Sequence, residues 1–324
     1  MTILVTGATG LVGNNVVRLL LERGQQVRVL VRESADPRPL EGLDVERATG
    51  DVRDAESVAR ACRGAQGVIH AAGYIHLGWT QLETARAINA VGTRNVAQAA
   101  REAGARMVHV STSNVMGLGS PGAPADEDTP PVGLVPCTYV VTKQEAERAV
   151  FDEIERGLAA SIVNPGYMLG PWDWKPSSGR MLLAVAKRFM PVAPRGGASV
   201  CDVRDVAAAI LTALERGETG RRYLLGGENM TYFDLWRRMA RVSGARGPVI
   251  PAGPLMRVIG GWIGDARARL TGLEGDLNSA GIAMSGQFHH YTSERARREL
   301  NYQPRPADVA IVAAWEWLSE HGYV

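Results

Sequence analysis

A tyrosine and a lysine four residues apart, Tyr139 and Lys143, lie in a stretch whose apolar spacing predicts a helix over Tyr139–Arg156. Residues four apart share one face of a helix, so the phenol and the ammonium group lie together. A free tyrosine has a pKa of about 10, whereas an acid or base that works near neutrality suits a pKa near 7. A neighbouring ammonium favours the phenolate and so lowers that pKa. The pair suits general acid–base chemistry; the alternative is a surface tyrosine beside a solvated lysine.

Three glycines, Gly7, Gly10 and Gly13, stand where the first predicted strand ends and the first predicted helix begins. The first glycine permits a tight turn, the second lets a pyrophosphate approach the backbone, and the third lets the helix pack on the strand. The N-terminus of the helix adds free N–H groups and a positive dipole. The motif predicts dinucleotide binding, and the alternative is a turn with only a structural role. The residues expected to contact the cofactor here are Gly7, Thr9, Gly10, Leu11, Val12 and Gly13.

The glycine spacing, taken with the Tyr-x-x-x-Lys pair, resembles the extended branch of the short-chain dehydrogenase/reductase superfamily. Within that branch, the sequence most resembles the dihydroflavonol-reductase-like and hopanoid-associated sugar-epimerase group, and the resemblance covers about residues 1–245. Further motifs follow in family order: Gly50–Asp54, His70–Gly73, Asn89–Val96, Ser111–Gly117, Pro165–Pro171 and Leu225–Asn229. The resemblance implies an NAD(P)-dependent oxidoreductase or epimerase, an α/β protein with a Rossmann-type doubly wound parallel sheet.

The resemblance also implies a third catalytic group, a hydroxyl at the end of the strand Arg106–Ser111. Three candidates stand side by side, Ser111, Thr112 and Ser113. Relatives use the hydroxyl five residues before the motif glycine, and counting back from Gly117 gives Thr112. Ser113 stays open as the alternative, because successive strand residues point to opposite faces only while the strand continues. We expect Thr112, Tyr139 and Lys143 to form the catalytic set, with Tyr139 and Lys143 also touching the cofactor.

An arginine, Arg32, follows the second strand, where an NAD-specific site would have an acidic residue. An arginine accommodates a 2′-phosphate, so we expect NADP(H), with Arg38 as a second contact and NAD(H) as the alternative. By resemblance, Asp51 and Val52 contact the adenine. The same comparison places two further groups around the cofactor, Ala71, Ala72 and Gly73 near the ribose and pyrophosphate, and Pro165, Gly166, Tyr167 and Met168 near the nicotinamide. Asn89 matches a helix-kinking asparagine of some relatives, but an ordinary helix asparagine explains it as well.

The expected substrate is a small molecule, and its pocket wall is rich in aromatic residues. That lining suits a flat, partly apolar ketone or aldehyde. The expected wall residues are Tyr74, Trp79, Asn114, Met116, Trp172 and Arg180. Asp202 stands where sugar-nucleotide enzymes of the branch usually have a histidine, and a carboxylate there would repel a nucleotide diphosphate. A reductase is therefore the main hypothesis, with a sugar-nucleotide epimerase or dehydratase and a non-catalytic NADP-binding regulator as alternatives.

Strands and helices alternate through the first half of the chain, which predicts βαβ units and a parallel sheet that carries these residues at one edge. The expected strands are Ile3–Thr6, Gln26–Val31, Gly67–His70, Arg106–Ser111 and Leu158–Val163, with Val200–Cys201 and Arg222–Leu225 as later additions. The expected helices are Leu11–Glu22, Ala55–Arg63, Thr80–Glu102, Tyr139–Arg156, Gly179–Phe189, Val203–Arg216, Tyr232–Ser243 and Ala307–His321. We expect a dinucleotide-binding domain over residues 1–165 and a smaller substrate-binding region over 166–324 that interleaves with it.

The composition and charge of the chain limit the classes of partner and the location that we expect for it. The chain of 324 residues has 36 Lys+Arg and 34 Asp+Glu, a net charge of +2, which gives no support to a nucleic-acid or membrane partner. The stretch Pro248–Gly264 is weakly polar but too short to span a bilayer. Three widely spaced cysteines and no signal-peptide pattern indicate the cytoplasm, and the spacing of the six histidines predicts no metal site. By analogy with the branch, the helices Thr80–Glu102 and Tyr139–Arg156 pair across a two-fold axis to form a homodimer.

Overall fold

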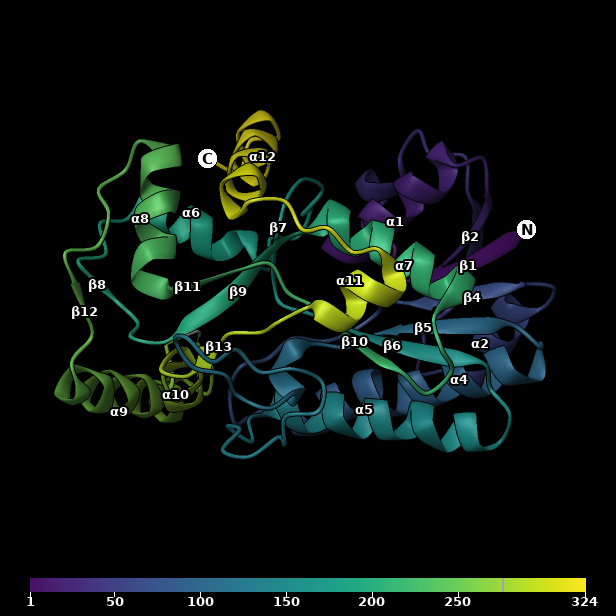
Figure 1. Ribbon diagram of the computed structural model, residues 1–324, viewed down its shortest axis with the longest axis horizontal. Helices are drawn as coiled ribbons and strands as arrows, with labels where there is room; N and C mark the ends of the chain where they lie inside the picture. The colour runs from purple at the N-terminus through teal and green to yellow at the C-terminus, as the bar shows by residue number, and fades with distance from the viewer. Residues whose placement is uncertain (276) are drawn as a thin grey trace.

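The computed structural model describes residues 1–275 and 277–324. Its centre is a seven-stranded parallel sheet with the strand order β10-β6-β5-β4-β1-β2-β3 (Figure 1). The strands are β1 (Thr2–Thr6), β2 (Gln26–Val31), β3 (Glu46–Thr49), β4 (Gly67–His70), β5 (Arg106–Val110), β6 (Ala160–Pro165) and β10 (Arg222–Leu225). The order runs outward in both directions from β1 and β4, which confirms the predicted Rossmann-type doubly wound sheet.

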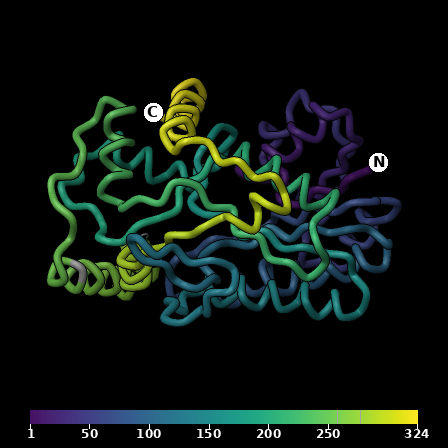
Figure 2. The backbone as a smooth tube through the Cα atoms, viewed as in Figure 1, coloured from purple at the N-terminus to yellow at the C-terminus, as the bar shows by residue number. Residues whose placement is uncertain are grey.

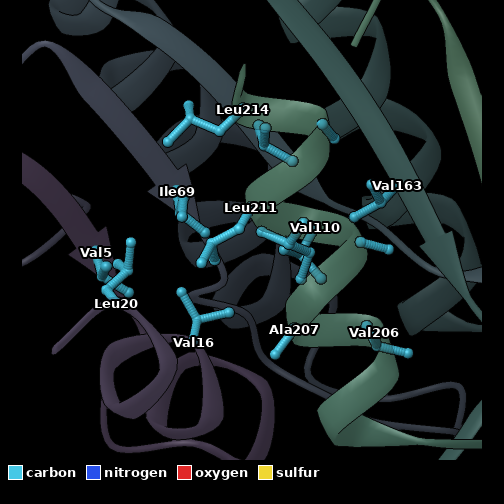
Figure 3. Packing of buried hydrophobic residues seen from close by; sticks show 14 of the residues in the cluster. Val5, Val16, Leu20, Ile69, Val110, Val163, Val206, Ala207, Leu211 and Leu214 are labelled. Carbon is cyan, nitrogen blue, oxygen red and sulfur yellow. The ribbon is translucent and has the colours of Figure 1, made fainter. Parts of the chain in front are cut away.

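The central strands β1, β4, β5 and β6 are buried on both faces. Successive side chains point to opposite sides of the sheet, so each of these strands contributes to both faces. In β1, Ile3 and Val5 belong to one hydrophobic cluster, whereas Leu4 belongs to the cluster on the other face. Figure 3 shows the first cluster, in which apolar side chains of the sheet meet those of a helix that comes late in the chain, including Leu211. A strand with both faces covered has no place for alternating polar residues, so it reads as a continuous apolar run.

Two layers of helices cover the sheet. One layer contains α1 and α7, and the other contains α2, α4 and α5 (Figure 1). The bounds are α1 (Leu11–Glu22), α7 (Val203–Arg216), α2 (Ala55–Cys62), α4 (Gly92–Glu102) and α5 (Thr138–Glu155). Each agrees with a predicted helix except that α4 is only the last part of the expected Thr80–Glu102. That region is divided into α3 (Leu82–Arg86), a π-helical turn (Ala87–Val91) and α4.

The later part of the chain builds a smaller layer against the carboxyl end of the sheet. A second sheet has the order β11-β9-β13, with β7 also paired to β9, and a short pair joins β12 to β8. Its strands are β7 (Tyr167–Leu169), β8 (Val192–Ala193), β9 (Gly197–Asp202), β11 (Glu228–Thr231), β12 (Ile250–Pro251) and β13 (Phe288–His289). Its helices are α6 (Gly179–Lys187), α8 (Tyr232–Ser243), α9 (Pro254–Thr271), α10 (Ser279–Ser285), α11 (Glu294–Leu300) and α12 (Ala307–Glu320).

The two parts share elements. Although β10 and α7 come after residue 165, both belong to the main sheet and its covering layer. Figure 2 shows the late chain crossing from the smaller part to the main sheet, where α11 lies, and then returning to α12. Within residues 1–275 and 277–324, no helix combines the length and the apolar character needed to cross a bilayer.

Candidate active site

All seven strands of the main sheet are parallel, so their carboxyl ends meet at one edge. The predicted cofactor residues follow β1, β2, β4 and β6, and the predicted catalytic hydroxyl follows β5. The topology therefore brings them to one edge from positions spread over 160 residues of sequence. This is the edge where open α/β sheets bind their ligands.

The glycine turn fits tightly against the chain behind it and is open in front. Gly7 has a φ of +71°, and a Cβ there would lie 2.5 Å from the backbone nitrogen of Ala72. A Cβ at Gly13 would collide with the carbonyl of Gly7, so helix and turn require glycine at both positions. Gly10 is exposed, and a Cβ there would meet only the Gly7 carbonyl, at 3.5 Å. No side chain caps α1 and its first turn has no acidic residue, which leaves its N–H groups available to a phosphate.

The loop after β2 begins with the exposed residue Arg32. Among the described side chains, none forms a hydrogen bond or an ion pair with the Arg32 guanidinium, which faces the carboxylate of Asp51 and helps to lower its pKa. Asp51 is held mainly by Arg53, whose hydrogen bonds lower the pKa of the carboxyl group further. Arg38, the expected second contact, is instead paired with Asp36 at 2.6 Å. Val52 is buried, and its carbonyl accepts a hydrogen bond from Asn95.

The hydroxyl of Thr112 lies near enough to the phenol of Tyr139 to lower the pKa of that group. Thr112 follows β5 in extended conformation, and its hydroxyl oxygen also accepts from the backbone N–H of Asn114 at 3.3 Å. Ser113 already belongs to a 3-10 turn, and its carbonyl accepts from Tyr291. Burial raises the pKa of Tyr139 to about 12, although the Thr112 hydroxyl opposes that shift. We expected Lys143 to lower this pKa, but in the protein alone burial dominates, so the phenol is protonated at neutral pH.

Lys143 lies one turn further along α5 and is almost completely buried. Its Nζ donates to the carbonyl of Val110 at 2.9 Å and lies 3.5 Å from Nε2 of His109. Burial lowers the pKa of Lys143 to about 8, and the carboxylate of Glu147 raises it in part. Burial and the charge of Lys143 lower the pKa of His109 in turn and bring that of His70 to about 3, so both stacked rings are neutral. Of these three groups, Lys143 alone therefore carries a positive charge.

A buried polar network that sequence reasoning missed holds these groups from behind. The side-chain amide of Asn164, on β6, donates to the carbonyl of Thr112 at 3.1 Å and to the carboxylate of Glu147 at 2.7 Å. Glu147 is also paired with Arg222 of β10 at 2.9 Å. The network joins β5, β6, β10 and α5, so it fixes the strand-end threonine relative to the helix that carries Lys143. Only the four-residue spacing of Lys143 and Glu147 was visible in the sequence.

Asn89 lies in the π-helical turn and is buried. Its side chain accepts from the backbone N–H of Tyr74 at 2.7 Å and donates to the Tyr74 carbonyl at 2.9 Å. A further bond joins it to the hydroxyl of Thr142, on the turn between Tyr139 and Lys143. The widened turn thus directs one amide both to α5 and to Tyr74. Tyr74 begins the segment 74–80, which we call the substrate loop because it carries the expected substrate contacts Tyr74 and Trp79. The sequence motif singled out this residue, but its function as a loop anchor was not predicted.

The substrate loop from Tyr74 to Thr80 is also anchored to the segment after α9. The buried carboxylate of Glu274 accepts from the backbone N–H groups of Trp79 and Thr80, from the Thr80 hydroxyl, and lies 2.8 Å from Nε2 of His76. Burial opposes ionisation, but these hydrogen bonds outweigh it and lower the pKa of Glu274 to about 2. The backbone N–H of Thr138, the first residue of α5, donates a hydrogen bond to the carbonyl of Gly78 in this loop at 2.9 Å. The loop therefore connects α9 with the start of α5, beside Tyr139.

The other expected contacts lie in varied surroundings. Asn114 is half-buried beside Thr112, whereas Met116 is buried in a small cluster with Leu224 and Tyr291. Trp172 packs in an aromatic cluster with Trp317, and the Arg18 guanidinium lies 3.3 Å above its ring. Arg180 is exposed at the start of α6 and acts electrostatically on Asp173 and Tyr167. Around the turn after β6, Pro165 ends the strand, Gly166 donates to the Leu225 carbonyl, Tyr167 donates to the Ser178 carbonyl, and Met168 packs on the main core.

Asp202 does not face an open site. It is completely buried, caps the N-terminus of α7 and accepts a hydrogen bond from Arg204 at 2.9 Å, with Arg305 at 3.8 Å. The carboxylate is thus neutralised inside the protein. The expected repulsion of a nucleotide diphosphate by Asp202 is therefore not supported, because the side chain turns back into its own helix.

The sequence and the fold match proteins of one family. The model of the NAD dependent epimerase/dehydratase family matches residues 3–226. The chain belongs to this family. It is thus a member of the extended short-chain dehydrogenase/reductases, a group of NAD(P)-dependent oxidoreductases and epimerases.

Two relatives match along the whole chain. A putative dihydroflavonol 4-reductase of Synechocystis sp. is 34% identical over 99% of this chain and 95% of its own length. Sterol demethylase protein B of Methylococcus capsulatus is 34% identical over the full length of both chains. Among solved structures, gox2253 superimposes with a TM-score of 0.87 and 38% identity over 99% of this chain and 98% of that one.

The residues at the sheet edge fit the NAD(P) that the epimerase/dehydratase family uses. The exposed face of Gly10 and the uncapped N-terminus of α1 leave room and N–H groups for a pyrophosphate. Lys143 offers a buried ammonium group beside Tyr139. Across the described residues, no three histidine, cysteine, aspartate or glutamate side chains come together in a way that would hold a metal ion.

Proposed function

We propose that this protein is an NADP(H)-dependent reductase of a ketone or aldehyde. The observation that carries the proposal is the approach of the Thr112 hydroxyl, just after β5, to the phenol of Tyr139, with the buried ammonium of Lys143 one turn further along α5. Such a pair suits a carbonyl oxygen that gains negative charge as it is reduced. The similarity to a putative dihydroflavonol 4-reductase supports reduction of an apolar carbonyl compound.

The residues divide the work as follows. NADPH, when bound, supplies the hydride for the carbonyl carbon. Thr112 donates a hydrogen bond to the carbonyl oxygen, and Tyr139 transfers its proton to that oxygen. The pKa of about 12 keeps Tyr139 protonated, which is the state that a proton donor needs. Lys143 would hold the ribose of the cofactor and supply positive charge one helical turn from Tyr139.

The direct test is the variant Tyr139→Phe, which keeps the ring and removes only the hydroxyl. We expect kcat for NADPH-dependent carbonyl reduction to fall by about 10²–10⁴-fold, the usual range for losing a general acid. The dissociation constant of NADPH, measured by calorimetry, stays within about twofold. Tyr223→Phe is the matched control, because its hydroxyl accepts from the backbone N–H of Glu218 and interacts with Glu299, and it has no part in the proposed site. Near-normal turnover of Tyr139→Phe would refute the assignment.

Preference for NADP(H) rests on Arg32. Its guanidinium lies after β2 without a hydrogen-bond partner among the described side chains, so it is available to a 2′-phosphate. A hydrogen bond to a charged group contributes about 1.5–3 kcal/mol, so Arg32→Ala should raise the dissociation constant of NADPH by about 10–100-fold and leave that of NADH unchanged. Arg38→Ala, which removes a guanidinium already paired with Asp36, is the control and should change neither. Tighter binding of NADH than NADPH by the unaltered protein overturns the preference.

A sugar-nucleotide epimerase is the second candidate, because the neutralised Asp202 no longer argues against a nucleotide diphosphate. An epimerase returns the hydride, so it converts substrate without net consumption of cofactor. Steady oxidation of NADPH with a carbonyl compound supports the reductase, whereas product from a sugar nucleotide without that oxidation supports the epimerase. Binding of NADPH without turnover of either substrate class would favour the non-catalytic regulator.

We also propose a homodimer formed through α4 and α5. These two helices lie next to each other on the outer surface of the main sheet (Figure 1). Their outward positions include Arg94, Gln98 and Arg148, which are exposed in the single chain. Light scattering should give twice the mass of one chain, and a monomer mass would remove this proposal.

A further inference from the structure

The helix α9 turns a broad apolar surface away from the protein. It packs on α10 through glycines: a Cβ at Gly264 would collide with the backbone of Leu277, and one at Gly261 would lie 3.3 Å from Ser279. Seven large apolar side chains of α9 are at least 49% exposed, and Trp262 is 79% exposed. These seven are Leu255, Met256, Val258, Ile259, Trp262, Ile263 and Leu270. Scattered exposed apolar residues are ordinary, but a contiguous group of this kind marks an interaction surface.

The apolar surface continues beyond α9 on the elements beside it. The pair of β8 and β12 carries the exposed residues Val249 and Ile250 directly before α9, and Phe189 lies just before β8. Figure 1 shows β8, β12 and α9 together at the end of the molecule far from β1 and β2. We call the exposed apolar residues of α9 with Val249 and Ile250 the distal face.

The charges on the segment that contains α9 are mostly positive. Between residues 244 and 272 the sequence has Arg246, Arg257, Arg267 and Arg269 against one acidic residue, Asp265. Asp265 turns toward α10 and accepts from the backbone N–H of Ser279 at 2.9 Å. Arg246, Arg267 and Arg269 are exposed. The segment therefore offers apolar side chains, one tryptophan and arginines, with its carboxylate turned to the protein.

This combination selects one kind of occupant. In a two-fold contact between copies of α9, the arginines of both copies would gather with no exposed carboxylate of the segment to pair with them. An anionic lipid surface provides what both parts of the face require, an apolar boundary for Trp262 and its neighbours and negative headgroups for the arginines. We propose that the distal face docks this protein on the surface of an anionic lipid bilayer.

Docking here would place the expected substrate loop beside the bilayer. Glu274 follows α9 and holds the loop through Trp79 and Thr80. That loop carries three further exposed apolar residues, Ile75, Leu77 and Trp79. The net charge of +2 predicts no membrane partner, but a sum over the whole chain averages out a local excess of arginine. The docking itself does not depend on carbonyl reduction, so it can be tested without any substrate.

The test is co-sedimentation of the full chain with vesicles. We expect binding to vesicles of phosphatidylcholine with about one third phosphatidylglycerol, weaker binding in high salt, and little binding to phosphatidylcholine alone. Trp262→Ser should lower the partition coefficient about tenfold or more, and Arg267→Gln with Arg269→Gln should lower it about fivefold per arginine. Val132→Ser is the matched control, since Val132 is 74% exposed on a different loop.

Each other outcome overturns the docking proposal. One is that the unaltered chain stays in solution with anionic vesicles, and another is that Val132→Ser and Trp262→Ser lose binding equally. A third is that light scattering without vesicles shows an assembly that Trp262→Ser dissolves, which would assign the face to a second copy of the chain. Because the altered side chains are exposed, unchanged circular dichroism and melting temperature should accompany every variant. Failure of this test leaves the Tyr139 assignment untouched, and failure of that assignment leaves the docking untouched.

Discussion

At the scale of single residues, the candidate chemistry depends on which of three adjacent hydroxyls meets the phenol. Thr112 has an extended backbone just after β5, and its hydroxyl lies near enough to the phenol of Tyr139 to lower the pKa of that group. Ser113 belongs to the next turn, and the buried hydroxyl of Ser111 has no hydrogen-bond partner among the described residues. The point at which β5 ends therefore decides which of the three hydroxyls can approach the phenol.

The choice of hydroxyl leads to a prediction with a built-in control. Thr112→Ser keeps the hydroxyl and should retain kcat within about threefold, whereas Thr112→Val keeps the shape and should lower kcat by about 10²–10³-fold, as loss of one oxyanion donor does. Ser113→Ala should leave kcat near that of the unaltered protein. The measurement is kcat and KM for carbonyl reduction in the three variants. A larger loss in Ser113→Ala than in Thr112→Val would move the role to Ser113.

The spacing of residues in the sequence predicted contacts only between groups that are close together along the chain. The four-residue spacing placed Tyr139 and Lys143 on one helical face, and the glycine turn was located by its position between strand and helix. Asn164 and Glu147 were not found, because their contact with Thr112 depends on how β5, β6 and α5 pack together. The pKa of Tyr139 was also predicted in the wrong direction for the protein alone, since burial of the phenol outweighs the charge of a lysine whose ammonium bonds to Val110.

At the scale of elements, the periodic spacing of apolar residues predicted regular helices and strands but not the points where they are interrupted. The bounds of α1, α7, α8 and β2 agree with the expected ones. The expected helix Thr80–Glu102 is interrupted by the π-helical turn at Asn89, which apolar spacing does not reveal. The pattern of apolar residues did not predict α9, because the proline and the three glycines in this stretch are typical of a loop. Those glycines instead let α9 lie close against α10.

The anchor between α9 and the substrate loop predicts a dependence on pH. The pKa of Glu274 is lowered to about 2 in the folded protein from its ordinary value of 4.5. A lowered carboxyl pKa stabilises the fold above the unfolded value, and the effect is lost as pH falls toward the folded value. The unaltered protein should therefore be more stable than Glu274→Gln by on the order of 3 kcal/mol at neutral pH, with the gap closing between about pH 5 and pH 2.

Chemical denaturation of both proteins at several pH values measures this gap. Glu218→Gln is the control, because the Glu218 carboxylate is 64% exposed and pairs only at the surface. Hydrogen exchange in residues 74–80 should rise in Glu274→Gln, since the backbone N–H groups of Trp79 and Thr80 lose a charged acceptor. A gap that stays constant down to pH 2, or grows as pH falls, would contradict the anchor.

At the scale of the whole molecule, the two predicted regions share one core. The cluster on one face of the main sheet contains strand residues such as Val5 with Ile210 and Leu211 of α7 and Leu300 of α11. A chain ended at residue 165 would lose α7, which covers that face of β4, β5 and β6. The packing therefore crosses the expected boundary at residue 165.

A shared core predicts that the two regions unfold together. Six of the seven tryptophans lie after residue 166, so tryptophan fluorescence reports mainly the later region, whereas far-ultraviolet circular dichroism reports helices of both. We expect the two signals to give the same denaturation midpoint.

Leu211→Ala in α7, which removes a buried contact with the sheet, should cost about 2–5 kcal/mol of stability and lower both midpoints equally. Leu235→Ala, buried among the smaller region's helices, should do the same, while Val309→Ala at a position 42% exposed should change neither by much. If fluorescence and dichroism separate in Leu235→Ala, the regions fold independently and the shared cluster does not couple them.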